Sequence, residues 1–407
     1  MGRFELKKIF CRTGGKVALL VLAIGLAVIC YAATLHVSYT DTSGDSLSGP
    51  AAARALRAAQ EEWGGPIDET MLRKVVAVNQ TIIASDDYQS DDVQRQNAAY
   101  SRTQGYETIR NLIAQTFEGF NNYNYFLIDS VDPDEVGQLY ERRVQNLKDW
   151  LARPDINFSP AEQAYLIEHY EALDTPLVNS YKEGWDTLIY YAPTLILFLM
   201  FVIVFLVSGI FPCEHRWKAD AIFFSSRMGR NKAVRAKIVA GLSTVTLLYW
   251  LAIAFYTAVL LLLLGSDGAQ SAFQLLKWKA FYNITIWQTY LLTIVGGYLG
   301  ILFLSLLAMF VSAASGSQIA GVIVPYVLVL AANFLNSLLS SWEVLPSILG
   351  LLPDQLLQLG QVLDDFNLYS VFGHITGSVP ILFVLYGILS LLLVPLMYHI
   401  YRKTTVR

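Results

Sequence analysis

The chain has 407 residues, of which 54% are hydrophobic and only 15% are charged, and its formal net charge is −4. Soluble domains usually carry about 25% charged residues. The deficit excludes an ordinary soluble globular protein and predicts that much of the chain lies in a membrane.

Six apolar stretches are each long enough to cross a bilayer, which requires about 20 residues. Apart from Lys16 at one edge, they contain no Asp, Glu, Lys or Arg. We predict an all-α polytopic membrane protein with six transmembrane helices, at Lys16–Val37, Leu188–Phe211, Ile238–Leu264, Gln288–Ala313, Ile319–Leu339 and Val379–Ile400. The first apolar stretch is longer than a signal-peptide core and no clean cleavage site follows it, so we expect an uncleaved helix after a leader at 1–15.

The segment 38–187 predicts a large, mainly helical domain between the first and second spans. It holds 25 Asp and Glu against 12 Lys and Arg, a difference of −13 that argues against nucleic acid as its partner. Ser159, Pro160 and Glu162 form a capping-box pattern, and Asp132 with Glu135 predicts another helix start. One apolar helical face is predicted for residues 69–85, made of Leu72, Val75, Val76, Ile82 and Ile83.

The stretch Phe117–Phe126 is rich in aromatic residues and asparagine. Such a stretch either forms a ligand-binding surface or packs as a turn under a helical core. The packed turn is the commoner use of buried aromatic residues, and we expect it here.

The distribution of Lys and Arg among the connections predicts the orientation, because these residues accumulate on the cytoplasmic side. The leader together with Lys16 holds five, the connection 212–237 holds seven and the tail 401–407 holds three, whereas 265–287 holds two and 340–378 holds none. We therefore expect both termini and 212–237 in the cytoplasm and 38–187 outside. The segment Ile348–Phe372, within 340–378, is interrupted by Pro353, Asp354, Asp364 and Asp365 and is predicted to be re-entrant or interfacial.

No motif for catalysis or for a bound cofactor occurs in the chain. The patterns G-x-x-x-x-G-K-[ST], H-E-x-x-H and G-x-S-x-G are absent, the five histidines lack ligand spacing, and Cys11, Cys30 and Cys213 form no C-x-x-C pair. We expect neither an enzyme nor a metal site, and no nucleotide site in this chain.

The predicted spans also lack the ionisable residues that proton- or ion-coupled carriers place in the membrane. Asn333 and Asn336 in the fifth span are candidate path-lining residues, although hydrogen bonding between helices is the commoner use of such amides. A protein of this kind is either passive or takes its energy from another chain.

The connection 212–237 combines a basic cluster with Phe223, Phe224 and Met228. Topology explains the Lys and Arg, but it does not explain these apolar residues or Glu214 at the end of the second span. Basic residues bind anionic headgroups, worth about 1 kcal/mol each near the surface, and aromatic residues dock into grooves of partner proteins. We expect docking onto a partner rather than lipid contact alone.

The stretch Glu214 to Lys237 resembles the segment between the second and third spans of type-2 ATP-binding-cassette exporter permeases. In that family an acidic residue ends the second span, and a coupling helix, a Ser-x-x-Gly-Arg-like turn and a basic residue follow. Glu214, Ser225 to Arg230 and Lys237 occupy these places. The resemblance extends to the six-span plan and to the small residues of Ser305–Gln318, and the large domain after the first span is similar to that of a Gram-positive subgroup.

The resemblance implies two paired permease subunits, identical or similar, in a bacterial plasma membrane. Each would offer its coupling helix to a separate ATPase subunit that binds ATP and Mg²⁺. The cargo would be hydrophobic or amphipathic, such as a peptide antibiotic, a lipid or an envelope precursor, and antimicrobial-peptide resistance is one expected role. The resemblance assigns ATPase coupling to Glu214, His215, Arg216, Phe223, Phe224, Ser225, Ser226, Arg227, Met228, Gly229 and Arg230.

An alternative from a different class is an ATP-driven transmembrane transmitter. In a transmitter, ATP turnover changes the shape of the external domain and no cargo crosses the membrane. The residue pattern leaves this alternative open, because both proteins need the same coupling segment.

Overall fold

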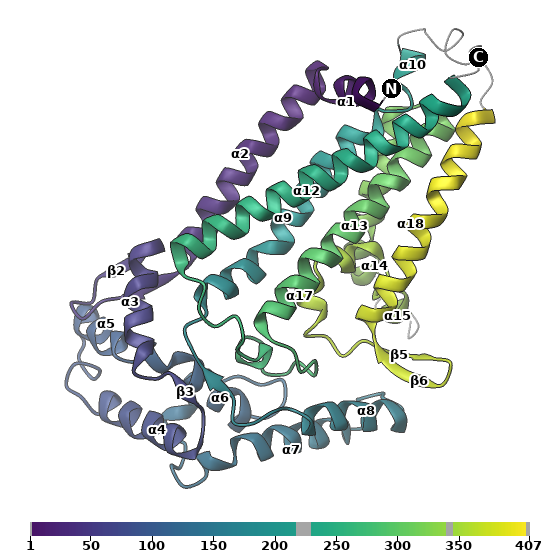
Figure 1. The fold of residues 1–407 in the computed structure, drawn as a ribbon. Coiled ribbons are helices and arrows are strands. Elements are labelled where there is room, and N and C mark those ends of the chain that lie inside the picture. The colour runs from purple at the N-terminus through teal and green to yellow at the C-terminus, as the bar shows by residue number, and fades with distance from the viewer. Residues whose placement is uncertain (1, 217–228, 339–344, 404–407) are drawn as a thin grey trace.

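The computed structural model describes residues 2–216, 229–338 and 345–403, with the backbone alone at 215–216, 229–230, 332–338 and 345–346. The chain is mostly helical (Figure 1). Five helices in the described residues are long and apolar enough to cross a membrane. They are α2 (Thr13–His36), α9 (Glu183–Ser208), α12 (Val234–Leu264), α13 (Ile286–Ser315) and α18 (Ser378–Lys403).

These five helices indicate a multi-pass membrane protein by their length and composition, and each overlaps a predicted span. The second begins at Glu183, five residues before the predicted Leu188, with Glu183 and Asp186 in its first turn, where the helix dipole favours acidic residues. The fifth predicted span, Ile319–Leu339, corresponds to α14 (Gln318–Leu338), whose apolar part among the described side chains, Gln318–Ala331, is shorter than the other five helices. A sixth crossing stays a prediction.

Helix α13 lies at the centre of the bundle and packs against α9, α12, α14 and α18. Its glycines permit this packing: a Cβ on Gly297 would lie 2.6 Å from Ile196 Cδ1 of α9, and one on Gly300 would lie 2.9 Å from Leu357 Cδ2. Without a hydrophobic driving force in lipid, helices associate through such close approach at small residues.

The segment after α14 folds into three short helices and a hairpin. The helices are α15 (Leu345–Leu349), α16 (Pro353–Leu357) and α17 (Leu359–Val362), and the strands are β5 (Leu368–Val371) and β6 (His374–Gly377). Leu356, Leu357 and Leu359 are buried in the same apolar core as the long helices. The segment therefore packs on the bundle through helices that are too short to cross a membrane, and its depth in the bilayer stays a prediction.

The region between α2 and α9 is helical, as predicted. It contains α3 (Gly49–Glu61), α4 (Glu69–Ile83), α5 (Val93–Ser101), α6 (Glu107–Phe117), α7 (Leu139–Leu151) and α8 (Pro160–Glu171). Two short antiparallel pairs join them, β1 (Ser38–Thr40) with β2 (Ser46–Ser48), and β3 (Gly65–Pro66) with β4 (Val178–Asn179).

Most of the local predictions for this region hold. The capping box at Ser159 is present, and Leu72, Val75, Val76 and Ile82 of α4 are buried. The helix start at Asp132 is wrong, because α7 begins at Leu139. The Asp132 carboxylate instead accepts from the backbone N–H of Asp134 and closes a turn.

The loop between α12 and α13 is part of the same domain. Leu275 and Trp278 lie in an apolar core with Trp63 and Ile67, and Phe281 packs with residues of α7 and α8. Arg143 of α7 donates to three backbone carbonyls, including those of Trp278 and Ala280. Hence the segments predicted to be external lie together, at the end of the bundle opposite both termini (Figure 1). Which end faces the cytoplasm stays a prediction.

The aromatic stretch 117–126 is only partly a packed turn. Phe120 stacks on Trp150 with ring centroids 4.6 Å apart. Tyr123 and Phe126, in contrast, are 53% and 61% exposed. The expectation holds for the first half of the stretch and fails for the second, in which Tyr123 and Phe126 are exposed to solvent.

Candidate functional site

The structure describes the two ends of the predicted coupling segment. Phe223, Phe224, Ser225, Ser226, Arg227 and Met228 lie outside the described residues. The backbone of His215 and Arg216 belongs to α10 (Cys213–Arg216), and that of Gly229 and Arg230 to the π-helical turn η4 (Gly229–Ala233) that leads into α12. The backbone of Asn333 and Asn336 belongs to α14, and their side chains are not among the described parts of the structure.

The two ends of the segment meet through an ion pair. Lys237, in the first turn of α12, places its Nζ 2.8 Å from Glu214 Oε1 of α10. Both side chains are buried, with exposed fractions of 0% and 5%. Glu214 is therefore paired with Lys237, the basic residue that closes the motif.

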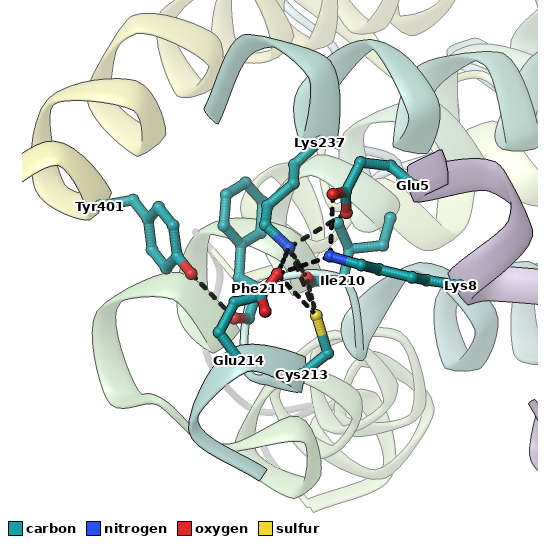
Figure 2. Close-up of polar contacts among 8 residues, drawn as sticks. All are labelled: Glu5, Lys8, Ile210, Phe211, Cys213, Glu214, Lys237 and Tyr401. Atoms are coloured by element: carbon teal, nitrogen blue, oxygen red, sulfur yellow. Dashed lines mark hydrogen bonds and ion pairs between the residues drawn. The ribbon is translucent and has the colours of Figure 1, made fainter. Parts of the chain in front are cut away.

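The N-terminal helix α1 (Gly2–Phe10) supplies a second pair of charges (Figure 2). Glu5 Oε2 lies 3.1 Å from Lys237 Nζ, and Lys8 Nζ lies 2.8 Å from Glu214 Oε1. Glu5 and Lys8 also pair with each other at 3.0 Å. Two carboxylates and two ammonium groups thus form one charge-neutral cluster, called here the inner charge cluster.

The cluster is held by backbone and thiol groups as well. Lys237 Nζ donates to the carbonyl of Ile210 at 2.9 Å and to Cys213 Sγ at 3.3 Å. Burial raises the pKa of the Cys213 thiol, so the sulfur is neutral at physiological pH. Beside it, Tyr401 of α18 donates to the carbonyl of Phe211 at 3.1 Å, which brings the last helix to the same place (Figure 2).

The electrostatics of the cluster favour the charged forms. Burial alone would raise the pKa of Glu214, but Lys237 and Lys8 outweigh burial and hold that pKa below its ordinary value. Burial likewise opposes the charge on Lys8, and its hydrogen bond to Glu214 raises the Lys8 pKa. Removing one partner from such a buried set leaves an uncompensated charge, which typically costs about 3–5 kcal/mol.

The geometry connects four parts of the chain: α1, the end of α9 with α10, the start of α12 and the end of α18. Arg12, just after α1, adds a hydrogen bond of 3.0 Å to the carbonyl of Leu206 near the end of α9. A displacement of α10 or of the start of α12 therefore acts on several helices at once, because ion pairs and buried hydrogen bonds hold their ends together.

The sequence did not point to Glu5 or Lys8 as part of this site. In the sequence the leader is a run of topology-setting basic residues, whereas in the structure it forms a helix that packs on α12. The available signal was Glu5 itself, the single acidic residue among the basic residues of the leader.

No metal-binding arrangement occurs in the part of the chain that the structure describes: no three His, Cys, Asp or Glu side chains are placed to hold an ion. No protein-family model matches the chain, and searches among curated proteins and among solved structures return no match.

Proposed function

We propose that this chain is the permease subunit of an ATP-binding-cassette exporter that moves a hydrophobic or amphipathic cargo. A separate ATPase subunit supplies the energy, and a second permease subunit completes the path. The observation that carries the proposal is the inner charge cluster, in which Glu214 and Lys237 close the base of the segment 214–237 and tie it to α1.

The proposal requires a segment that transmits a displacement caused by the ATPase to the transmembrane helices. A segment attached flexibly at one end would move without displacing the helices. Here both ends are fixed by buried charges, so motion of the segment between them is transmitted to α9, α12 and α1 together. The apolar spans without internal ionisable residues support an external energy source and an uncharged path.

The test is a pull-down of the tagged protein from its native membrane. Wild type is compared with the triple variant Phe223→Ala/Phe224→Ala/Arg227→Ala, and Lys277→Ala, in the loop predicted to be external, is the matched control. We expect an ATPase subunit to co-purify with wild type and with the control, and to be lost from the triple variant. Absence of an ATPase from the wild-type sample would contradict the proposal.

The second candidate is the ATP-driven transmitter, which one observation favours. The loop 265–285 is built into the core of the domain between α2 and α9, so movement of α12 or α13 is passed directly to that domain. Proteoliposomes containing permease and ATPase separate the candidates: an exporter moves labelled amphipathic peptide or lipid when ATP is added, whereas a transmitter hydrolyses ATP without flux.

A further inference from the structure

A cavity of about 320 Å³ lies in the domain between α2 and α9, among α4, α5, α6 and the turn after α6. Its walls are amides, hydroxyls and aromatic rings around a single arginine, and its lining includes Asn79, Asn97, Tyr100, Thr103, Arg110 and Tyr125. Arg110 is 4% exposed, so its charge is almost wholly removed from bulk water.

Among the described residues, Arg110 has no ion-pair partner. Its two terminal nitrogens donate to the same residue, Tyr125, at 2.6 Å to the phenol oxygen and 3.2 Å to the backbone carbonyl. In the described part of the chain no carboxylate pairs with the guanidinium, and its buried Nε has no hydrogen-bond partner. A buried cation in this state is costly unless an anion joins it.

A second buried arginine in the same domain shows what a structural role requires. Arg143 is 3% exposed and also lacks a carboxylate partner among the described residues. Each of its three nitrogens nevertheless donates to a backbone carbonyl, those of Trp278, Tyr170 and Ala280. Arg143 is therefore satisfied by the fold, whereas Arg110, which lines the cavity, has a buried Nε without a partner among the described residues.

Among the described residues neither nearby acid forms an ion pair with Arg110, although the Arg110 charge partly offsets the burial that raises the pKa of Glu107. Asp129 accepts a hydrogen bond of 2.8 Å from the Asn79 amide and forms no ion pair with Arg110. Glu107, one turn earlier on α6, lines a different cavity, towards α9. The position opposite the guanidinium is thus open to a negative group from outside the chain.

We propose that this cavity binds a small organic carboxylate, with Arg110 as the residue that recognises the anionic group. The planar guanidinium matches a carboxylate, the phenol of Tyr125 fixes the guanidinium, and Ile83 and Tyr88 provide apolar walls for the body of the ligand. One cation in the described lining suits a monoanion better than a phosphate dianion. The proposal is independent of the permease function.

The second half of the aromatic stretch 117–126 contributes to this site through Tyr125. The Tyr125 ring lies under the Arg110 guanidinium, 3.7 Å from its carbon. This stacking holds the guanidinium plane in one orientation at little cost, since the ring face attracts the cation. The turn after α6 therefore forms one wall of a ligand site.

The test uses the full chain in lipid nanodiscs and two fluorinated probes, 4-fluorobenzoate and its neutral amide 4-fluorobenzamide, followed by ligand-observed ¹⁹F NMR. We expect the acid to bind and the amide to bind at least tenfold more weakly. Arg110→Gln should weaken the acid at least tenfold without changing the amide. Arg102→Gln, an exposed arginine paired with Asp87 near the same cavity, is the control and should bind the acid as wild type does.

Three results would overturn the proposal: equal binding of acid and amide to wild type, unchanged binding of the acid to Arg110→Gln, or displacement of the acid by inorganic phosphate at lower concentration than by benzoate. The comparison of acid with amide uses wild type alone, so it stands if Arg110→Gln fails to fold. Arg110→Lys keeps the charge without the planar fork, and we expect it to bind the acid at an intermediate level.

Discussion

The two ends of the molecule bury charge in opposite ways. At the inner charge cluster two carboxylates and two ammonium groups neutralise one another within 3.1 Å. In the cavity at the other end, the Arg110 guanidinium lies beside tyrosine and amide groups with no carboxylate partner among the described residues. A neutral buried cluster is complete and fixes the positions of helices, whereas an uncompensated buried charge keeps the capacity to bind something else.

The largest effect is expected from breaking the balance of the inner charge cluster. Lys237→Met leaves two buried carboxylates with Lys8 alone, and we expect it to destabilise the protein by about 3–5 kcal/mol. Thermal unfolding in detergent, followed by tryptophan fluorescence, measures the loss. Lys232→Met, at an exposed position five residues earlier, is the matched control and should have no effect.

The double variant Glu214→Gln/Lys237→Met tests whether charge balance, and not the loss of Lys237 itself, determines the stability of the inner charge cluster. Removing an acid together with the base leaves Glu5 and Lys8, which again neutralise each other. We expect the double variant to be more stable than Lys237→Met alone. If the two variants unfold at the same temperature, the pairing of Glu214 with Lys237 contributes nothing measurable.

A smaller effect is expected at Asp354 of α16, a buried carboxylate that no cation of the described residues pairs with. Its Oδ1 has no hydrogen-bond partner in that part of the chain, its exposed fraction is 5%, and burial raises its pKa to about 6. The folded state therefore holds more protons than the unfolded state between pH about 4 and about 6, so stability falls as the pH rises through this window.

Asp354→Asn removes this cost. We expect the variant to be more stable than wild type by about 2–3 kcal/mol at pH 7.5, since one pKa unit corresponds to about 1.4 kcal/mol. At pH 4 the two proteins should unfold alike. The measurement is the thermal midpoint from pH 4 to 7.5, and a constant difference between the two proteins across that range would refute the assignment.

The smallest effect is expected at Glu5, which keeps α1 on the bundle. Glu5→Gln retains a hydrogen-bonding side chain but removes the charge 3.1 Å from Lys237 Nζ. Lys237 keeps Glu214, and the surplus charge falls on Lys8, whose side chain is 30% exposed to water. We therefore expect a loss of about 1 kcal/mol, smaller than for Lys237→Met, which acts locally as easier release of α1. Limited trypsin digestion after Lys7 or Arg12 should become roughly fivefold faster, while cleavage after the exposed Arg95, in the domain between α2 and α9, keeps its wild-type rate.

The sequence predicts the long helices well and the buried charges poorly. A stretch of about 20 apolar residues is a local property, which is why α2, α9, α12, α13 and α18 overlap their predicted ranges. Glu214 was recognised because it ends an apolar run. Glu5 and Arg110 carry no such mark, since their burial arises from packing between segments that are distant in the chain.

The loop 265–285 shows the same limit. Its two lysines and its position between spans predict an external connection. They do not predict that Trp278 is buried in the same core as Trp63. The aromatic stretch 117–126 was predicted as a packed turn because aromatic residues are usually buried. Only the structure places Tyr125 against Arg110, a contact that depends on how the turn folds back on α6.

The participation of the loop between α12 and α13 has a consequence for biosynthesis. Trp278 belongs to the same apolar core as Trp63, which is synthesised much earlier. Arg143 likewise depends on the later carbonyls of Trp278 and Ala280 as hydrogen-bond acceptors. The domain after α2 is therefore unable to finish folding on the growing chain when α9 emerges from the ribosome. Its last core residues arrive only after α12 has been inserted, so completion of the domain reports that the first three long helices have reached their places in the membrane.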